Sequence, residues 1–160
     1  DIQNGFKNNI EQMSSKMLKL KDVFFVAHSM GGIYALHLAN KYPNKVLGAV
    51  TMGTPYGGVE AADYAKYLFP FYTLMKDIST TSKPVRQSDE IVVYHPWTQI
   101  VTTKGTSPWI NKDNDGVVTV DSQKHHDGME FIEMAETHHE VLMLPKTVEI
   151  IKEKITVVKK

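Results

Sequence analysis

Apolar residues recur near the start of the chain with the spacing of one helix face. Five of them follow one another at intervals of four, three, four and three residues: Phe6, Ile10, Met13, Met17 and Leu20. On an α-helix such residues form one apolar stripe, which packs against the rest of a folded domain. The pattern therefore predicts an amphipathic helix over residues 6–20 that ends near Lys21.

Two short apolar runs follow, at residues 23–27 and 45–52, and a second helical segment separates them. Continuous apolar runs of this length are typical of strands that are buried on both faces. Between them, residues 30–42 predict a helix that Pro43 ends. Strand, helix and strand joined by short connections predict a parallel βαβ unit.

The later part of the chain continues this alternation. Residues 90–95 predict a third strand and residues 129–135 a fourth, with a long polar loop between them. A closing amphipathic helix follows Pro145. We therefore expect an α/β fold with a mostly parallel sheet and flanking helices. The length predicts a single domain over residues 1–160.

One segment, residues 59–83, departs from this pattern because aromatic and long apolar side chains crowd around Pro70. Two interpretations fit these residues equally well. They form a pair of core helices, or they form an apolar cap over a site that takes acyl or aryl groups.

Composition and charge restrict the partners that we expect. The chain has 18 lysine and arginine residues and 18 aspartate and glutamate residues, so that its formal net charge is zero. This balance favours neither nucleic acid nor an anionic membrane as a partner. No uninterrupted apolar stretch reaches the length of a transmembrane helix. The chain has no cysteine, which excludes disulfides and thiol chemistry.

The connection between the first strand and the second helix consists of small residues around a serine. Its sequence over residues 27–32 is Ala-His-Ser-Met-Gly-Gly. A tight strand-to-helix turn leaves little room two residues either side of its apex, where Ala27 and Gly31 stand. Such a turn exposes Ser29 at the end of the strand, as in a nucleophile elbow. An ordinary glycine-rich turn is the competing interpretation.

A serine hydroxyl becomes a good nucleophile only beside a base, and that base needs a third group to orient it. The chain supplies both groups downstream. Asp115 lies in an Asn-Asp-Gly turn after the predicted third strand, and His138 follows the fourth. Loops after parallel strands meet at one edge of the sheet. We therefore expect Ser29, Asp115 and His138 to come together.

Four motifs in this order resemble bacterial lipases and esterases of the α/β-hydrolase fold. They are Ala-His-Ser-Met-Gly-Gly at 27–32, Gly-Thr-Pro-Tyr-Gly-Gly at 53–58, Asn-Asp-Gly-Val-Val at 114–118 and His-His-Glu-Val-Leu at 138–142. The resemblance implies that Ser29 is the nucleophile, Asp115 the orienting acid and the backbone N–H of Met30 one oxyanion-hole donor. It also implies hydrolysis of carboxylic ester or lipid substrates through an acyl-enzyme, without a cofactor. Acyl transfer and peptide hydrolysis would use the same three residues.

Two adjacent histidines compete for the role of the base. In the resembled families a proline stands six or seven positions after the catalytic histidine. Pro145 lies seven positions after His138 and six after His139. The residues between them favour His138, and His139 is the alternative.

The resemblance also concerns strands that come before those predicted here. The complete fold begins with further strands, and a loop after one of them donates the second oxyanion-hole N–H. No such loop precedes the predicted helix at residues 6–20. We therefore expect the chain to be the C-terminal part of the fold, completed by an upstream segment or a partner chain. The non-enzyme alternative is a hydrolase-fold binding or scaffold module without turnover.

Two further patterns suggest metal ions only weakly. The run Asn-Lys-Asp-Asn-Asp-Gly at 111–116 fits an EF-hand calcium loop at three positions, but Asn111 and Ser122 stand where the loop needs acids. The histidine pairs at 125–126 and 138–139 point to opposite faces of an extended segment, a poor geometry for chelation. The sequence therefore predicts no metal site.

Overall fold

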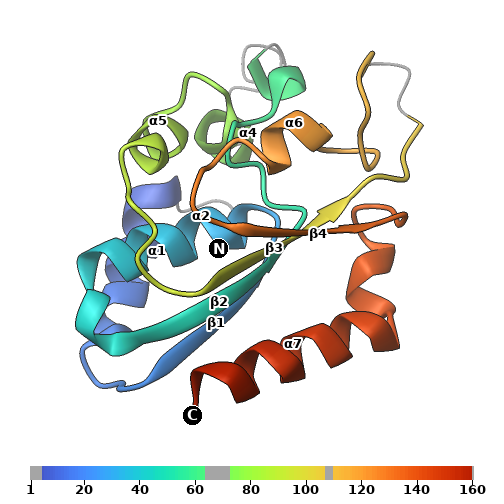
Figure 1. Cartoon of the computed structure of the whole chain (residues 1–160). Helices are drawn as coiled ribbons and strands as arrows, with labels where there is room; N and C mark the ends of the chain where they lie inside the picture. Colours follow the sequence, from blue (N-terminus) through green and yellow to red (C-terminus); the bar gives the residue numbers. More distant parts are fainter. Residues whose placement is uncertain (1–4, 64–72, 107–109, 160) are drawn as a thin grey trace.

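The computed structural model describes residues 5–63, 73–106 and 110–159. Its strands form one parallel sheet in the order β1-β2-β3-β4. Helices cover both faces of this sheet (Figure 1). The predicted α/β architecture with a mostly parallel sheet and flanking helices is therefore confirmed.

The strands bring the ends of distant segments to one edge of the sheet. Their bounds are Val23–His28 for β1, Val46–Met52 for β2, Trp97–Thr102 for β3 and Glu130–Met134 for β4. Because all neighbouring pairs are parallel, the four carboxyl ends lie at the same edge. The loops that follow the strands therefore meet there, as the sequence predicted.

The helices divide between the two faces of the sheet. Most of the helical segments lie on one face, and α7 crosses the other (Figure 1). The longer ones are α1 (Gly5–Met17), α2 (Met30–Lys41) and α7 (Pro145–Val158). Shorter ones are α4 (Thr73–Ile78), α5 (Lys83–Asp89), α6 (Val120–Gln123) and the 3₁₀ turns η1 (Pro43–Lys45) and η2 (Glu140–Met143).

Helix α1 ends at Met17, three residues before the predicted end at Leu20. The Lys45 ammonium donates to the carbonyl oxygens of Leu18 and Leu20, at 3.2 and 2.8 Å. This contact satisfies two backbone carbonyl groups of the turn that follows α1. The turn after α1 is thus held by Lys45 at the end of η1, a tertiary contact that the spacing of apolar residues does not reveal.

The prediction of a third strand at residues 90–95 is wrong. Residues 91–95 have no regular structure, and β3 begins at Trp97. The polar residues of β3 led to the prediction of a loop at this position, yet the whole strand is buried. Gln99 accepts a hydrogen bond from the Thr51 hydroxyl at 2.5 Å, and the Thr98 hydroxyl donates to Glu130 at 3.0 Å. Side-chain hydrogen bonds therefore satisfy polar groups in the middle of the sheet.

Apolar side chains pack on both faces of the sheet. On the α2 face, Ala35, Leu36 and Ala39 lie in one cluster with residues of β2 and β3. On the α7 face, Val50 and Ile100 lie in another cluster that includes Ile150 of α7. The small residues Ala35 and Ala39 on α2 let this helix lie close to the sheet.

The segment predicted as a cap falls partly outside the described residues, because residues 64–72 are not among them. Its described flanks contribute Val59, Ala62 and Ile78 to an apolar cluster that also includes Met30 and Val118. These flanks therefore pack beside the start of α2. The cap itself stays a prediction.

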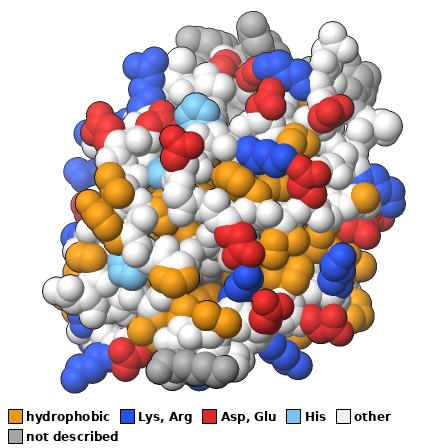
Figure 2. All heavy atoms as spheres, in the orientation of Figure 1, with side chains coloured by type: hydrophobic (Ala, Val, Ile, Leu, Met, Phe, Trp, Pro, Cys, Tyr) orange, Lys and Arg blue, Asp and Glu red, His pale blue; other side chains and the backbone are white. Residues whose placement is uncertain are grey.

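The surface carries both signs of charge. Figure 2 shows acidic and basic side chains intermixed with apolar ones on the visible face, in keeping with the zero net charge. Within the described ranges, no helix has the length and apolar character needed to cross a bilayer.

Candidate active site

Ser29 forms the apex of the turn between β1 and α2. Its backbone lies at φ 54° and ψ −133°, and Asp22 is the only other non-glycine residue with positive φ in the described parts. Its N–H donates to the carbonyl oxygen of Met52 at 2.9 Å, and its own carbonyl accepts from Gly32 at 3.0 Å. A non-glycine residue in such a conformation is strained, and strain of this kind gathers at functional sites.

Small residues surround the apex, although their roles differ from those predicted. A Cβ atom at Gly31 would lie 3.5 Å from the Cβ of Ala27, an ordinary contact. A Cβ atom at Gly32 would collide with the side chain of Thr54. The strict need for glycine therefore lies at Gly32, where α2 begins against the loop after β2.

The imidazole of His138 and the carboxylate of Asp115 form a buried pair. His138 Nδ1 lies 2.7 Å from Asp115 Oδ2, and the two side chains are 4% and 0% exposed. The backbone N–H of His138 also donates to the carbonyl oxygen of Asp115, at 3.0 Å. Because a carboxylate only accepts, Nδ1 carries the proton in this pair. In the neutral ring the lone pair is then on Nε2, where a general base needs it.

The turn that carries Asp115 is shaped by its own hydrogen bonds. Asp115 Oδ1 accepts from the backbone N–H groups of Val117 and Val118, at 3.0 and 2.8 Å. Gly116 stands at φ 98°, a conformation that favours glycine. The carboxylate of Asp115 thus faces His138.

Two polar side chains that the sequence did not single out also contact Asp115. The Thr102 hydroxyl donates to Oδ2 at 2.5 Å, and Gln123 Nε2 donates to the same atom at 3.3 Å. Thr102 is the last residue of β3, so the misplaced third strand concealed it. Gln123 ends α6, and no pattern in the sequence distinguishes a buried glutamine from an exposed one.

Burial and hydrogen bonding act in opposite directions on Asp115. Burial raises the pKa of its carboxyl group, whereas hydrogen bonds from His138, Thr102 and Val118 lower it. The net effect lowers the pKa of Asp115 below its usual value. The group therefore stays ionised at neutral pH and can orient an imidazole.

Gly53 connects the serine turn to this pair. It follows Met52, whose carbonyl oxygen accepts from Ser29, and it lies at φ 56°. A Cβ atom at Gly53 would lie 3.0 Å from His138 Nδ1 and 3.3 Å from Asp115 Oδ2. A side chain at this position would push against the buried pair, so the loop after β2 needs glycine here.

His28 lies against the predicted base. Its Nε2 donates to the backbone carbonyl oxygen of His138 at 2.7 Å, and the two ring centroids are 4.5 Å apart. Burial lowers the pKa of His28. His139 is exposed, with its ring centroid 5.2 Å from that of His138. The buried position and the carboxylate partner favour His138 over His139 as the base.

The serine hydroxyl and the predicted oxyanion donor complete this region. Among the described residues, no hydrogen bond joins the Ser29 hydroxyl to His138. In unliganded enzymes this contact is often long and tightens when substrate binds. Met30 is the first residue of α2, so its N–H has no acceptor within the helix.

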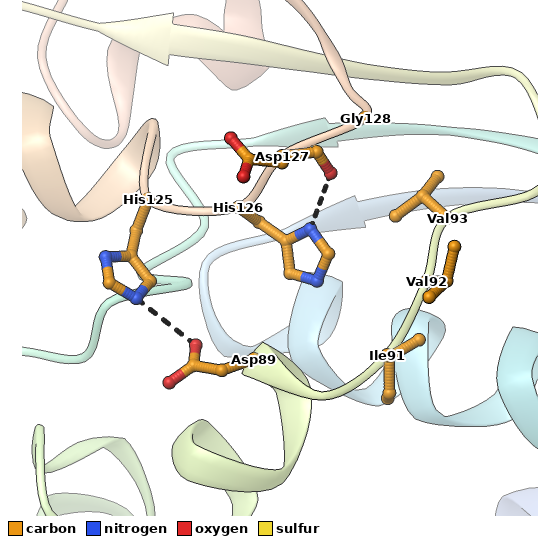
Figure 3. Close-up of a pocket in the computed structure, with 8 residues that line it drawn as sticks. All are labelled: Asp89, Ile91, Val92, Val93, His125, His126, Asp127 and Gly128. Carbon is orange, nitrogen blue, oxygen red and sulfur yellow. Dashed lines mark hydrogen bonds and ion pairs between the residues drawn. The ribbon is translucent and has the colours of Figure 1, made fainter.

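A separate cavity of about 340 Å³ lies between the segments at 89–93 and 125–128 (Figure 3). His125 Nε2 contacts Asp89 at 3.3 Å, and the buried ring of His126 faces the carbonyl oxygens of Ser88 and Asp127. The sequence predicted that these two side chains point to opposite faces, whereas both line this one cavity, where they contact different partners (Figure 3). No group of three or more metal-ligating side chains comes together in the described part of the chain.

Comparison with known proteins identifies the family. The model of the alpha/beta hydrolase fold family matches residues 7–87, about half of the chain. The chain belongs to the α/β-hydrolase fold family. Residues 7–87 of this α/β-hydrolase include the serine turn and the loop that begins at Gly53. No curated protein matches it in sequence.

Solved structures agree with this assignment at the level of the fold. The mature form of the Bacillus licheniformis lipase BlEst2 has a TM-score of 0.73 and 16% identity, covering 92% of this chain and 73% of the lipase. The Paleococcus ferrophilus monoacylglycerol lipase has a TM-score of 0.61 and 13% identity, with coverage of 95% and 74%. The putative non-heme bromoperoxidase BpoC from Mycobacterium tuberculosis H37Rv has a TM-score of 0.66 and 13% identity, with coverage of 94% and 73%. At these identities the likeness shows the fold alone.

Proposed function

We propose that this α/β-hydrolase cleaves carboxylic esters through an acyl-enzyme. Ser29 is the nucleophile, His138 the general base and acid, and Asp115 the group that orients His138. The observation that carries the proposal is the buried His138–Asp115 pair, with Nδ1 and Oδ2 2.7 Å apart. The strained turn at Ser29 supports it, and the family supports hydrolase chemistry in general.

The reaction proceeds in two halves. Ser29 Oγ attacks the ester carbonyl carbon while His138 Nε2 takes the hydroxyl proton. The backbone N–H of Met30 donates to the oxyanion of the tetrahedral intermediate, and one such donor contributes about 3 kcal/mol. The intermediate collapses, and the leaving alkoxide takes the proton from His138. Water activated by the same imidazole then attacks the acyl-enzyme and releases the acid and Ser29.

The substrate that we propose carries an apolar acyl group. Met30 belongs to the apolar cluster formed with Val59, Ala62 and Ile78, so apolar side chains lie close to the proposed oxyanion donor. The names of two solved neighbours, a lipase and a monoacylglycerol lipase, agree with ester or lipid substrates. A cap over residues 59–83 would extend this apolar surface.

A further strand beside β1 would complete the sheet that holds the site. In the described sheet β1 lies at an edge, and Val26 is 49% exposed. A groove lined mainly by apolar residues of α1, β1 and α2 runs beside it. We propose that an upstream segment or a partner chain pairs with β1 and supplies the second oxyanion-hole N–H.

Active-site labelling tests the proposed function directly. The folded protein is treated with a fluorophosphonate probe and assayed with p-nitrophenyl esters of increasing acyl length. We expect labelling and hydrolysis in the wild type and loss of both in Ser29→Ala. Folded wild-type protein that neither labels nor hydrolyses these esters supports the binding-module alternative. Product analysis with an added alcohol separates hydrolysis from acyl transfer.

A further inference from the structure

We propose that Thr102 and Gln123 are positioning residues of this site, which hold the Asp115 carboxylate and balance its charge beside His138. The inference rests on the proposed function, in which Asp115 orients the base. It concerns two side chains that touch neither substrate nor reacting atoms and act through Asp115.

The two oxygens of Asp115 have different partners. Among the described residues, Oδ1 accepts backbone N–H groups of its own turn, from Val117 and Val118. Oδ2 accepts from three side chains: His138 Nδ1 at 2.7 Å, the Thr102 hydroxyl at 2.5 Å and Gln123 Nε2 at 3.3 Å. Thr102 and Gln123 therefore act on the same oxygen that faces the base.

The amide of Gln123 is fixed by the backbone of Thr102. Gln123 Oε1 accepts from the Thr102 N–H at 2.8 Å, and Nε2 donates to the Thr102 carbonyl oxygen at 2.9 Å. A flipped amide would set donor against donor and acceptor against acceptor, so this orientation is the satisfied one. The second Nε2 proton then faces Asp115 Oδ2.

The hydroxyl of Thr102 has a single proton to donate. Its oxygen lies 2.5 Å from Asp115 Oδ2 and 3.2 Å from Gln123 Oε1. The charged and closer acceptor takes the proton, because hydrogen bonds to ionised groups are the stronger ones. Thr102 thus donates to the carboxylate, and Gln123 supports both of them.

The same contacts tie together the ends of the segment that carries Asp115. Thr102 ends β3, and Gln123 ends α6, whose first turn is capped by the Thr119 side chain. The amide of Gln123 therefore joins the strand before Asp115 to the helix after it. This arrangement limits how far the carboxylate can move relative to β3.

Because Thr102, Gln123 and Asp115 are buried, the two donors strongly affect the charge of the Asp115 carboxylate. Thr102 and Gln123 are fully buried, and Asp115 is 1% exposed. In such surroundings water does not compensate a carboxylate, so its charge depends on the donors that remain. With a donor removed, Asp115 attracts the imidazolium proton of His138 more strongly.

The first test is a pH–rate profile of ester hydrolysis, normalised to active sites by fluorophosphonate titration. In Thr102→Val we expect kcat to fall about tenfold, because a hydrogen bond to a charged group is lost, with KM unchanged. We expect the acid limb to move to higher pH. Gln123→Met removes the amide donor to Oδ2, and we expect it to move the acid limb of the profile in the same direction. Thr102→Ser keeps the hydroxyl and restores the wild-type profile.

Thr98→Val is the matched control. Thr98 lies on the same strand, is 3% exposed, and its hydroxyl also donates to a carboxylate, that of Glu130 at 3.0 Å. We expect this variant to lower stability and leave the profile unchanged. The proposal is overturned if the acid limb of the pH–rate profile does not move in Thr102→Val, or if it moves equally in Thr98→Val. If Gln123→Met does not fold, the Thr102 variants still test the contact of Thr102 with Asp115.

A spectroscopic test separates this inference from the proposed function. The Nδ1 proton between His138 and Asp115 is buried, so we expect a proton resonance far downfield that is absent in His138→Ala. We expect it to shift in Thr102→Val and not in Thr98→Val, whether or not esters are hydrolysed. An unchanged resonance in Thr102→Val overturns the positioning role. A shift without turnover by the wild type overturns only the proposed function.

Discussion

Ser29 holds its backbone in a region that residues with a side chain rarely enter. The hydrogen bond from its N–H to Met52 and the first turn of α2 keep it there. Backbone strain of this kind costs about 1–3 kcal/mol, which the surrounding structure must offset. The turn is thus less stable than an unstrained one would be, and it holds the serine hydroxyl at the end of a strand.

This strain predicts an order of stability among two inactive variants. Ser29→Gly removes the steric cost of positive φ, whereas Ser29→Ala keeps it. We expect the glycine variant to have a free energy of unfolding at least equal to that of the alanine variant, and up to about 1 kcal/mol higher. Urea denaturation measures the difference. A clearly less stable glycine variant would argue against strain at this turn.

The two adjacent histidines predict opposite effects on activity. His138→Ala removes the buried partner of Asp115, so we expect kcat to fall by about four or more orders of magnitude. His139→Ala changes an exposed ring, and we expect activity within a few-fold of the wild type. Steady-state hydrolysis of a p-nitrophenyl ester measures both. An active His138→Ala with an inactive His139→Ala would reverse the assignment.

The lowered pKa of Asp115 predicts how stability depends on pH. The carboxylate stabilises the folded state fully above about pH 4, where an unfolded aspartate titrates, and this contribution is lost as pH falls through the folded pKa. In Asp115→Asn we expect a shallower loss of stability below that pH. Urea denaturation between neutral and acidic pH compares the two proteins. Identical slopes would contradict the prediction.

At the scale of elements, the sequence predicted best where residue type and periodicity agree. Strand β1, helix α2 and strand β2 were placed to within about one residue, because apolar runs and Pro43 mark their limits. Strand β3 was missed because Thr98, Gln99 and Thr102 are polar and find their partners only in the folded sheet. The missed strand and the missed Thr102 thus have one cause.

The start of α2 offers a matched pair of glycines. In Gly32→Ala the new Cβ would collide with Thr54, and we expect a loss of about 1–3 kcal/mol in the free energy of unfolding. In Gly31→Ala the new Cβ meets Ala27 at an ordinary 3.5 Å, and helix propensity favours alanine by up to about 1 kcal/mol. Urea denaturation of both variants tests the contrast. Equal effects would mean that Thr54 moves aside.

At the scale of the whole molecule, the sheet is covered on both faces, and β1 and β4 form the two edges of its described part. The loops after the strands bring side chains from positions 29, 115 and 138 to one end of this sheet. The sequence predicted that meeting because parallel strands place their carboxyl ends together. It did not predict the contacts of Gln123, since they depend on where α6 packs.

The open edge at β1 predicts how the isolated chain behaves in solution. An exposed edge strand with apolar neighbours promotes pairing between molecules. We expect Val26→Lys to reduce concentration-dependent association of this chain, and light scattering over a dilution series measures it. The matched change Val157→Lys lies on the exposed side of α7 and should have no effect. Equal behaviour of both variants would place any association elsewhere.

His28 links the segment of the proposed nucleophile to that of the proposed base. It precedes Ser29 in the chain, and its ring nitrogen donates to the carbonyl oxygen of His138. This hydrogen bond joins the residue before Ser29 to the backbone of the loop that carries His138. A change at position 28 would therefore disturb the spacing between the proposed nucleophile and the proposed base without altering either residue.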